Sequence, residues 1–205
     1  MQEEGGMPEA KQRDAEATRL RILAAATAEF AAHGFAGARI DRIAEAASAN
    51  KRMIYAYYGN KGALFDRVIE HVFEHLEASV PFTPDDLVGY ATTLFDYLMD
   101  HPNHLRIDAW RRLERPAATD VEREMYQRRV DSLAELQADF GMGGRFGPGD
   151  VLTIVVALAS AWEGAPDGLR PFAAKDRDRQ RELVAGTMYV LASAIAPKLI
   201  QPKRS

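Results

Sequence analysis

The chain has 205 residues, no cysteine and a formal net charge of −4 at pH 7. Its length allows one or two domains with a buried core, and the lack of cysteine excludes a disulfide framework, a thiolate metal site and a cysteine nucleophile. The first ten residues are polar and acidic, unlike a signal peptide, and the longest apolar run, around residues 151–162, is too short to span a bilayer. We therefore expect a cytoplasmic protein without a membrane segment.

The charges are distributed unevenly along the chain. Residues 11–65 contain nine Lys and Arg against five Asp and Glu, whereas the rest of the chain is acidic. A protein with one basic end and an acidic body can approach DNA through that end only. The negative net charge therefore does not exclude a nucleic-acid-binding protein.

The N-terminal part predicts a short arm followed by one long helix. Residues 1–13 combine two glycines, a proline and mixed charges, so we expect a disordered arm, either a solvated tail or a basic extension to the DNA backbone. From Asp14 to His33 apolar residues recur at helical spacing, and Gly34 is expected to end the helix. The residues predicted to face inward are Leu20, Leu23, Ala26 and Phe30.

Two short helices are predicted within residues 39–58. The first has an apolar face, and Asn50 is a good N-cap for the second, which runs from about Lys51 to Tyr57. Two helices joined by a turn of three to four residues form a helix-turn-helix. The second helix leaves basic and aromatic side chains exposed, as a major groove flanked by phosphates requires.

The stretch from Gly34 to Phe65 closely resembles, without a gap, the DNA-binding module of tetracycline-repressor-type (TetR family) regulators. The resemblance covers residues 14 to 75 and implies an all-α fold of about nine helices, with a three-helix DNA-binding domain at residues 14–79 and a helical ligand-binding and dimerisation domain at residues 83–205. It also implies a homodimeric repressor that binds a palindromic DNA operator and is released by a small-molecule effector, with no cofactor. The matching residues are Gly34-Phe35, Ile43-Ala44-Glu45-Ala46-Ala47, Lys51, Ile54-Tyr55, Tyr57-Tyr58, Lys61 and Ala63-Leu64-Phe65.

Exposed residues of this module are the candidates for DNA contacts. Arg52 lies near the N-terminal end of the second helix, which reaches deepest into the groove, and is expected to contact a guanine with Lys51 beside it. Arg39 can pair with a phosphate through its guanidinium group. Tyr55 and Tyr57 can donate their hydroxyl protons to phosphates.

Four further candidates each have a structural alternative. Thr18 occupies a position that in the resembling family often bonds a phosphate, but it is also simply an early-helix hydroxyl in water. Asn50 is expected to cap its helix rather than to contact a base, and Met53 either touches a thymine methyl group or fills a gap. Lys61, which follows the expected cap Asn60, offers a charge and a helix N-terminus to a phosphate.

Several residues depart from the family pattern. Ala38 stands where a Ser or Thr commonly caps the first short helix, and Ser48 replaces the usual glycine of the turn. Asp41 occupies a site that is often basic, so it would repel phosphate unless it pairs with Arg42 or contacts a cytosine amino group. These changes leave the predicted fold intact but leave the operator sequence undetermined.

The remainder of the chain is predicted to be helical after a break at residues 81–84. Glycine-rich residues 141–149 are expected to form a flexible connection, because their spacing is not that of a phosphate-binding loop. The expected helices cover about residues 84–100, 103–115, 119–140, 150–163 and 177–196. The third of them is expected to carry a solvated charged face formed by Arg123, Glu124, Arg128 and Arg129.

Two functions are expected of these C-terminal helices. The last two are strongly apolar and carry small residues along one face, which predicts a four-helix homodimer interface, with packing inside a monomer as the alternative. Aromatic and amphipathic residues on these helices are candidates to line a ligand pocket, with core packing as the alternative. The candidates for the pocket are Phe95, His104, Trp110, Tyr126 and Trp162.

Two other classes of function are alternatives to a DNA-binding regulator. His71, Glu74 and His75 form an H-x-x-E-H pattern, which in a metal-dependent hydrolase would hold zinc. The pattern is short and falls inside a helix that the DNA-binding module already explains, so we expect no metal site and no enzyme. A helical interaction module that does not bind DNA is the second alternative, and the helix-turn-helix argues against it.

Overall fold

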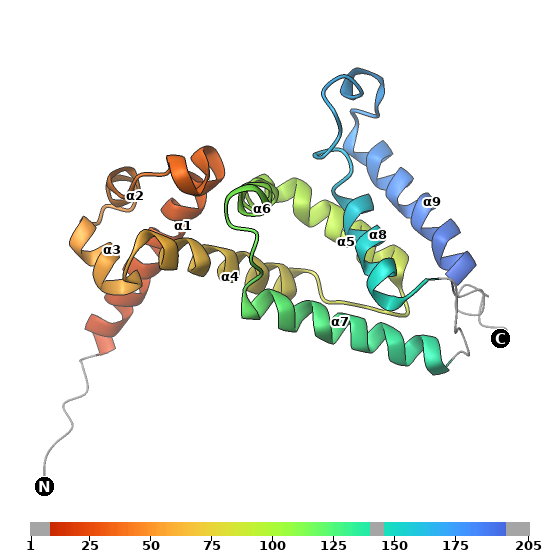
Figure 1. Ribbon diagram of the computed structural model, residues 1–205, viewed down its shortest axis with the longest axis horizontal. Coiled ribbons are helices and arrows are strands. Elements are labelled where there is room, and N and C mark those ends of the chain that lie inside the picture. Colours follow the sequence, from red (N-terminus) through yellow and green to blue (C-terminus); the bar gives the residue numbers. More distant parts are fainter. Residues whose placement is uncertain (1–8, 140–145, 196–205) are drawn as a thin grey trace, which may run out of the picture. The chain divides into compact units, whose positions relative to one another are not determined.

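The computed structural model describes residues 9–139 and 146–195, and helices are the only regular secondary structure in these ranges (Figure 1). Nine α-helices and one short 3₁₀-helix occur in the described residues, with no strand among them. This confirms the predicted all-α fold of about nine helices. None of the helices described is both long and apolar enough to cross a membrane. The helices are α1 (Glu9–Gly37), α2 (Ile40–Ala46), α3 (Lys51–Tyr58), α4 (Lys61–Ser79), α5 (Leu87–Asp100), α6 (Pro102–Glu114), α7 (Asp120–Asp139), α8 (Pro148–Ala159), η1 (Arg170–Phe172) and α9 (Arg177–Ile195).

The chain divides into two compact units. Unit 1 contains residues 1–72 and 106–119, and unit 2 contains residues 73–105 and 120–205. Helices α4 and α6 therefore each contribute residues to both units. The sequence predicts a boundary at residues 79–83, whereas the units divide inside these two helices, because the C-terminal part of α6 packs on the end of α1.

Unit 1 has a core of apolar side chains from its first four helices. Phe30, Phe35 and Phe65 pack ring against ring, with centroids 4.9 Å apart for Phe30 and Phe65 and 5.4 Å apart for Phe35 and Phe65. The predicted inward residues Leu23, Ala26 and Phe30 are buried. The ring contacts join α1 to α4, and α1 also packs against α2.

Helix α1 differs from its prediction in two respects. It begins at Glu9, so residues 9–13, which were expected to belong to a disordered arm, are helical, while residues 1–8 of that arm lie outside the described residues. Leu20 was expected to face inward but is 56% exposed, and Ile22 is buried in its place. Two positions along a helix correspond to a rotation of about 200°, so these two side chains point to opposite sides.

Unit 2 is organised around α5. Helices α8 and α9 pack against α5, and α7 packs against α8 (Figure 1). Helix α5 begins after Asp86, whose side chain accepts a hydrogen bond from the backbone N–H of Gly89. The predicted glycine-rich connection lies largely outside the described residues. The buried residues of α5 are Leu87, Tyr90, Ala91, Thr92, Leu94, Phe95, Tyr97 and Leu98.

Helix α7 buries an arginine that the sequence places in solvent. Arg129 was expected on the solvated face, but it is only 4% exposed. It lies four residues after Met125 and four before Leu133, both of which are buried, and residues four apart share one side of a helix. The charged residues of α7 that are exposed as predicted are Arg123, Glu124 and Arg128.

Candidate DNA-binding surface

Helices α2 and α3 form the predicted helix-turn-helix, joined by four residues. The backbone N–H groups of Ala47 and Ala49 donate to the carbonyls of Ile43 and Ala44, at 2.9 Å in both cases. Ser48 has a φ of 49°, in the left-handed region that glycine adopts without steric cost. The turn therefore keeps the usual backbone shape although its glycine is missing.

Asn50 fixes the start of α3. Its side-chain oxygen accepts a hydrogen bond from the backbone N–H of Met53 at 2.9 Å, which is the geometry of an N-cap. Ile54 is buried on the core side of the helix, and Lys51 and Arg52 are exposed. The predicted cap is confirmed, and the side-chain oxygen of Asn50 is occupied within the protein.

A long-range contact replaces the missing cap of α2. The N-cap residue Arg39 makes no side-chain capping bond, but its backbone N–H donates to Glu29 on α1 at 2.8 Å. The same Glu29 oxygen accepts a hydrogen bond from Arg42 Nε at 2.8 Å. Burial works against the charged form of Glu29, but the hydrogen bonds from Arg42 and Arg39 outweigh it and lower the pKa of this carboxyl. The sequence offered no local signal for this contact, because the partners are 10 and 13 residues apart.

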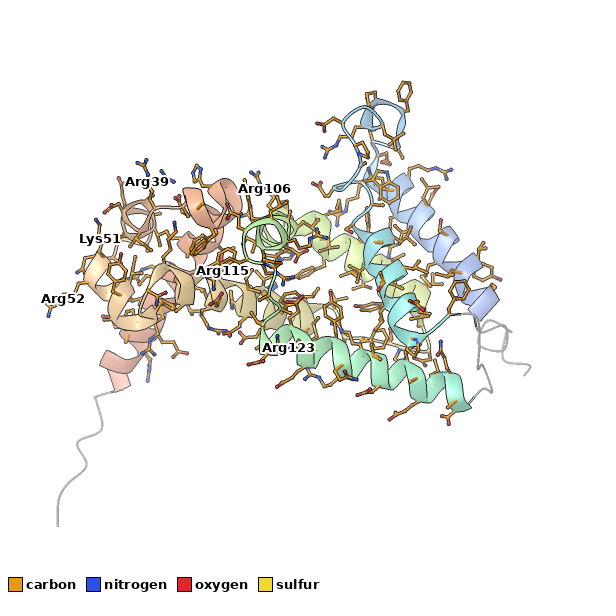
Figure 2. All side chains as sticks on the ribbon, viewed as in Figure 1. Arg39, Lys51, Arg52, Arg106, Arg115 and Arg123 are labelled. Atoms are coloured by element: carbon orange, nitrogen blue, oxygen red, sulfur yellow. The ribbon has the colours of Figure 1, made fainter. Side chains whose placement is uncertain are left out.

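Three cations stand on the outside of the helix-turn-helix (Figure 2). Arg39 and Arg52 form no ion pair with any residue in the described part of the chain. Lys51 instead pairs with the exposed Asp41 at 2.5 Å, so Asp41 pairs with Lys51 and not with Arg42. Two guanidinium groups are thus available for an anionic partner, while the charge of Lys51 is partly compensated.

The tyrosines of α3 take different places. Tyr55 is exposed, as a residue available to a partner must be. Tyr57 is half-buried, with the Arg19 guanidinium 4.9 Å from the centre of its ring, and the Tyr58 hydroxyl donates to the Arg19 carbonyl at 3.0 Å. Arg19 therefore holds α3 against α1. This role was not predicted from the sequence, because the contact between the Arg19 guanidinium group and the Tyr57 ring depends on how the two helices pack.

Two predicted contact residues are engaged inside unit 1. Thr18 is buried, and its hydroxyl donates to the Asp14 carbonyl at 2.8 Å and accepts from Arg21 at 3.0 Å. The prediction that Thr18 bonds a phosphate is thus not supported, because its hydroxyl bonds back within α1. Lys61 donates to the Ala36 carbonyl at 3.2 Å and is only half exposed.

Comparison with known proteins assigns this surface to a family. The model of the bacterial regulatory proteins of the tetR family matches residues 22–68, and that of the tetracyclin repressor-like C-terminal domain matches residues 86–188. The HTH-type transcriptional repressor SCO4008 of Streptomyces coelicolor is 47% identical over 152 residues, covering 72% of this chain and 79% of that protein. The chain belongs to the TetR family.

Solved structures of the TetR family agree with this assignment. The crystal structure of the transcriptional regulator SCO4942 from Streptomyces coelicolor matches with a TM-score of 0.76 and 33% identity, covering 85% of this chain and 97% of that one. The structure of AibR in complex with isovaleryl coenzyme A and operator DNA shares the fold, with a TM-score of 0.58 at 13% identity over 83% of this chain and 97% of that one. As a TetR-family member the chain is a DNA-binding transcriptional regulator and not an enzyme.

In this TetR-family chain the C-terminal part of α6 belongs to unit 1 and fastens the end of α1. The side chains of Arg106 and Trp110 both donate to the Ala31 carbonyl, at 3.1 and 3.3 Å. Arg115, just after α6, donates to the Gly62 carbonyl and pairs with Asp66 on α4, each at 3.2 Å (Figure 2). These contacts account for Trp110, predicted as a pocket residue, by packing within unit 1.

The other predicted pocket residues lie in unit 2 as separate pairs. Phe95 is buried and meets the ring of Trp162 edge to face at 5.9 Å. Tyr126 meets Phe73 in the same manner at 6.2 Å. His104 is bonded to the Tyr97 hydroxyl. The structure therefore places Phe95 and Trp162 together, and their role in ligand binding stays a prediction.

His75 of the H-x-x-E-H pattern is hydrogen-bonded within the protein. His75 Nδ1 lies 2.8 Å from the Tyr97 hydroxyl, and His104 Nδ1 lies at the same distance from it. Burial raises the pKa of Tyr97, so this hydroxyl stays protonated and can donate to one ring while it accepts from the other. In the described ranges no three side chains of His, Asp or Glu are placed to hold a metal ion.

Helix α9 exposes large apolar side chains. On α9, Val184, Met188 and Ala192 are buried, whereas Tyr189 and Val190 are exposed. Large apolar residues on the outer side of a terminal helix are unfavourable in water, and covering them would stabilise the protein. Helix α9 is one of the two helices through which the sequence predicts dimerisation.

Proposed function

We propose that this chain is a homodimeric, cytoplasmic repressor that binds a palindromic operator through the exposed side of α2 and α3, and that a small-molecule effector in unit 2 releases it. In this proposal unit 1 is the DNA-binding domain, predicted at residues 14–79, and unit 2 is the ligand-binding and dimerisation domain, predicted at residues 83–205. The cytoplasm is where a regulator of this kind meets its operator.

The observation that carries the proposal is the pair of exposed guanidinium groups on a fixed helix-turn-helix. Asn50 holds the start of α3, so Arg52 stands at the end of the helix that enters the major groove. Arg52 is assigned to a guanine, whose O6 and N7 match its two donors, and Arg39 to a phosphate. Lys51, Tyr55 and Tyr57 complete the proposed contacts.

The exposed apolar side chains of α9 support the dimer. A palindromic site requires two identical reading heads about 34–36 Å apart, one DNA turn, and a symmetric dimer supplies them. Two relatives of this chain are named transcriptional repressors, SCO4008 and NicS of Pseudomonas putida, which is 38% identical over 100 residues. Their names favour repression over activation.

Helices α4 and α6 offer a route for release, because each runs from unit 2 into unit 1 without interruption. An effector that shifts either helix in unit 2 would alter the contacts of Trp110, Glu114 or Arg115 in unit 1. The structure of AibR with isovaleryl coenzyme A and operator DNA gives one precedent for both kinds of partner on this fold. An effector acts only through its different affinity for the two states of the protein.

Selection of bound duplexes from a random pool tests the proposal. The wild-type protein should enrich a palindrome; Arg52→Ala should lose discrimination at one base pair, by about 1–3 kcal/mol, and Arg39→Ala should weaken binding to all sequences alike. Arg112→Ala, an exposed arginine of α6, is the matched control and should enrich the same palindrome. Enrichment of a non-palindromic site, or of no site at low salt, would overturn the proposal.

A further inference from the structure

One arginine of unit 2 is buried without an acidic partner. Arg129 on α7 is 4% exposed, and no Asp or Glu in the described ranges pairs with it. Its Nη1 donates to the hydroxyl of Tyr90 at 2.5 Å, whereas Nη2 is buried with no hydrogen-bond partner. A guanidinium stays charged at all accessible pH values, and burial of a charge without compensation is strongly unfavourable. An anion at Nη2 would therefore stabilise this part of the protein.

Toward a third group, the pair formed by Arg129 and Tyr90 presents hydrogen-bond donors. The Tyr90 hydroxyl accepts from Arg129, and no described residue accepts the hydroxyl proton. Burial raises the pKa of Tyr90, which Arg129 offsets only in part, so the hydroxyl remains protonated at neutral pH. Two neighbouring donors, one of them charged, match the two oxygens of a carboxylate.

The surroundings of this pair are apolar. Phe82 lies edge to face on Tyr90, with ring centres 4.9 Å apart, and its ring centre is 6.0 Å from the Arg129 guanidinium. Met125 and Leu133 flank Arg129 one helical turn away on either side and are buried. Phe82 lies in the non-helical segment between α4 and α5 and is half-buried, so its side chain is not held in place by a helix of its own.

We propose that Arg129 and Tyr90 bind the carboxylate of a small organic acid with an apolar body, and that this acid is the effector of the regulator. Its apolar part takes the place of the Phe82 ring. Because Phe82 follows the end of α4 at Ser79 by three residues, its displacement acts on the helix that continues into unit 1. The inference rests on the proposed function, from which it takes the role of unit 2 in effector binding.

Matched acids and amides test the charge requirement. The melting temperature of the full-length protein and titration calorimetry are compared for benzoate with benzamide and for hexanoate with hexanamide, at millimolar concentrations. A ligand that binds the folded state raises the melting temperature, so at least one acid should do so and its amide should not. Equal responses to acid and amide, or no response to either acid, would overturn the proposal.

Variants locate the site. Arg129→Met should weaken acid binding by about 10- to 100-fold, the loss expected for a hydrogen bond to a charged group, and Tyr90→Phe should weaken it less. Arg129→Lys should retain part of the affinity. Arg123→Met, on the same helix but exposed, is the control and should bind as the wild type does (Figure 2). Acid binding that survives in Arg129→Met would overturn the assignment.

The stability of the ligand-free variants gives a second readout. If Arg129 serves a ligand, replacing its uncompensated charge by methionine of similar size should leave the ligand-free protein at least as stable as the wild type. If Arg129→Met melts well below the wild type and Arg129→Lys does not, Arg129 is a structural group and the proposal is overturned. A wild-type protein that selects a palindrome but responds to neither acid refutes this inference alone. One that binds an acid through Arg129 but selects no palindrome refutes the proposed function alone.

Discussion

The carboxylate of Glu114 on α6 accepts a hydrogen bond from the backbone N–H of Phe35, 79 residues earlier in the chain, at 2.5 Å. It also accepts from the N–H of Ala36 at 3.1 Å. Gly34 interrupts α1 with φ 68° and ψ −178°, so the N–H groups after it lack the partners four residues back that a continuous helix provides. Glu114 therefore caps the last turn of α1 from a distant element.

Loss of this cap should destabilise unit 1. Glu114→Ala leaves two backbone N–H groups without their acceptor, and we expect a loss of about 1–3 kcal/mol in the free energy of unfolding. Chemical denaturation of the purified protein measures it. Glu45→Ala removes an exposed glutamate of α2 and is the control. Equal effects of the two substitutions would show that Glu114 contributes only its charge.

Gly34 should tolerate no side chain. Its backbone conformation is nearly exclusive to glycine, and an added Cβ would lie 2.8 Å from Trp110 Cε3. We expect Gly34→Ala to lower the free energy of unfolding by about 2–4 kcal/mol, from backbone strain and overpacking together. Gly149→Ala, where nothing lies within 4 Å of the new methyl group, should be nearly neutral in the same thermal-unfolding assay. A stable Gly34→Ala protein would contradict the role given to this kink.

Asp41 should restrain DNA binding through its pair with Lys51. Asp41→Asn frees the ammonium group now held at 2.5 Å and removes a negative charge near the phosphates. Affinity for both operator and random DNA should then rise several-fold at low salt, and the gain should shrink as salt screens the charges. Fluorescence anisotropy with labelled duplexes measures both. Glu45→Gln makes the same change in net charge without releasing Lys51. An equal gain in affinity for this variant would show that the ion pair between Asp41 and Lys51 does not restrain DNA binding.

The features that could be predicted from the sequence are those that depend on residues a few positions apart. The cap at Asn50 and the buried Ile54 follow from spacings of three and four residues within one helix, and both are found in the structure. Glu29 and Glu114, which close the ends of α2 and α1, could not be found this way, because each depends on how distant helices pack. The burial of Ile22 was not predicted for a related reason. Several faces of α1 carry apolar residues, and the packing of the other helices decides which face is buried.

Arg129 shows where the composition of a helix misleads. Four charged residues near the start and middle of α7 suggest one solvated face, and three of them are exposed. The fourth lies in the i, i+4 series with Met125 and Leu133, and that spacing was the available signal for its burial. An arginine in an apolar stripe therefore predicts a buried charge, which a count of charged residues along the helix does not.

The outer side of α9 should hold the dimer together. Val190 is 69% exposed in the single chain, and Val190→Arg would place a charge in the proposed interface. We expect sedimentation to show a monomer with unchanged helix content, and operator affinity to fall because a single head reads only half of the site. Leu113→Arg, at a position 78% exposed on α6, is the control and should remain dimeric. A dimeric Val190→Arg protein would place the interface elsewhere.

Glu29 should make the stability of unit 1 depend on pH. Its pKa in the folded protein lies below the ordinary value of 4.5, because the bonds from Arg42 and the Arg39 N–H outweigh the effect of burial. A lowered pKa adds stability that is complete above the unfolded value and is lost as the pH falls through the folded value. Glu29→Gln keeps an acceptor oxygen for the Arg39 N–H but carries no charge, so it removes this dependence.

Thermal unfolding of the wild type and Glu29→Gln, followed from neutral pH to below the folded pKa, tests this expectation. The wild type should melt higher near neutral pH, and the two curves should converge as the pH falls below the ordinary carboxyl value. A constant difference at all pH values would mean that the amide fails for steric reasons, and no difference at neutral pH would mean that the charge of Glu29 does not hold α2 to α1. Asp85→Asn, which removes an exposed carboxylate of unit 2, should leave the wild-type profile unchanged.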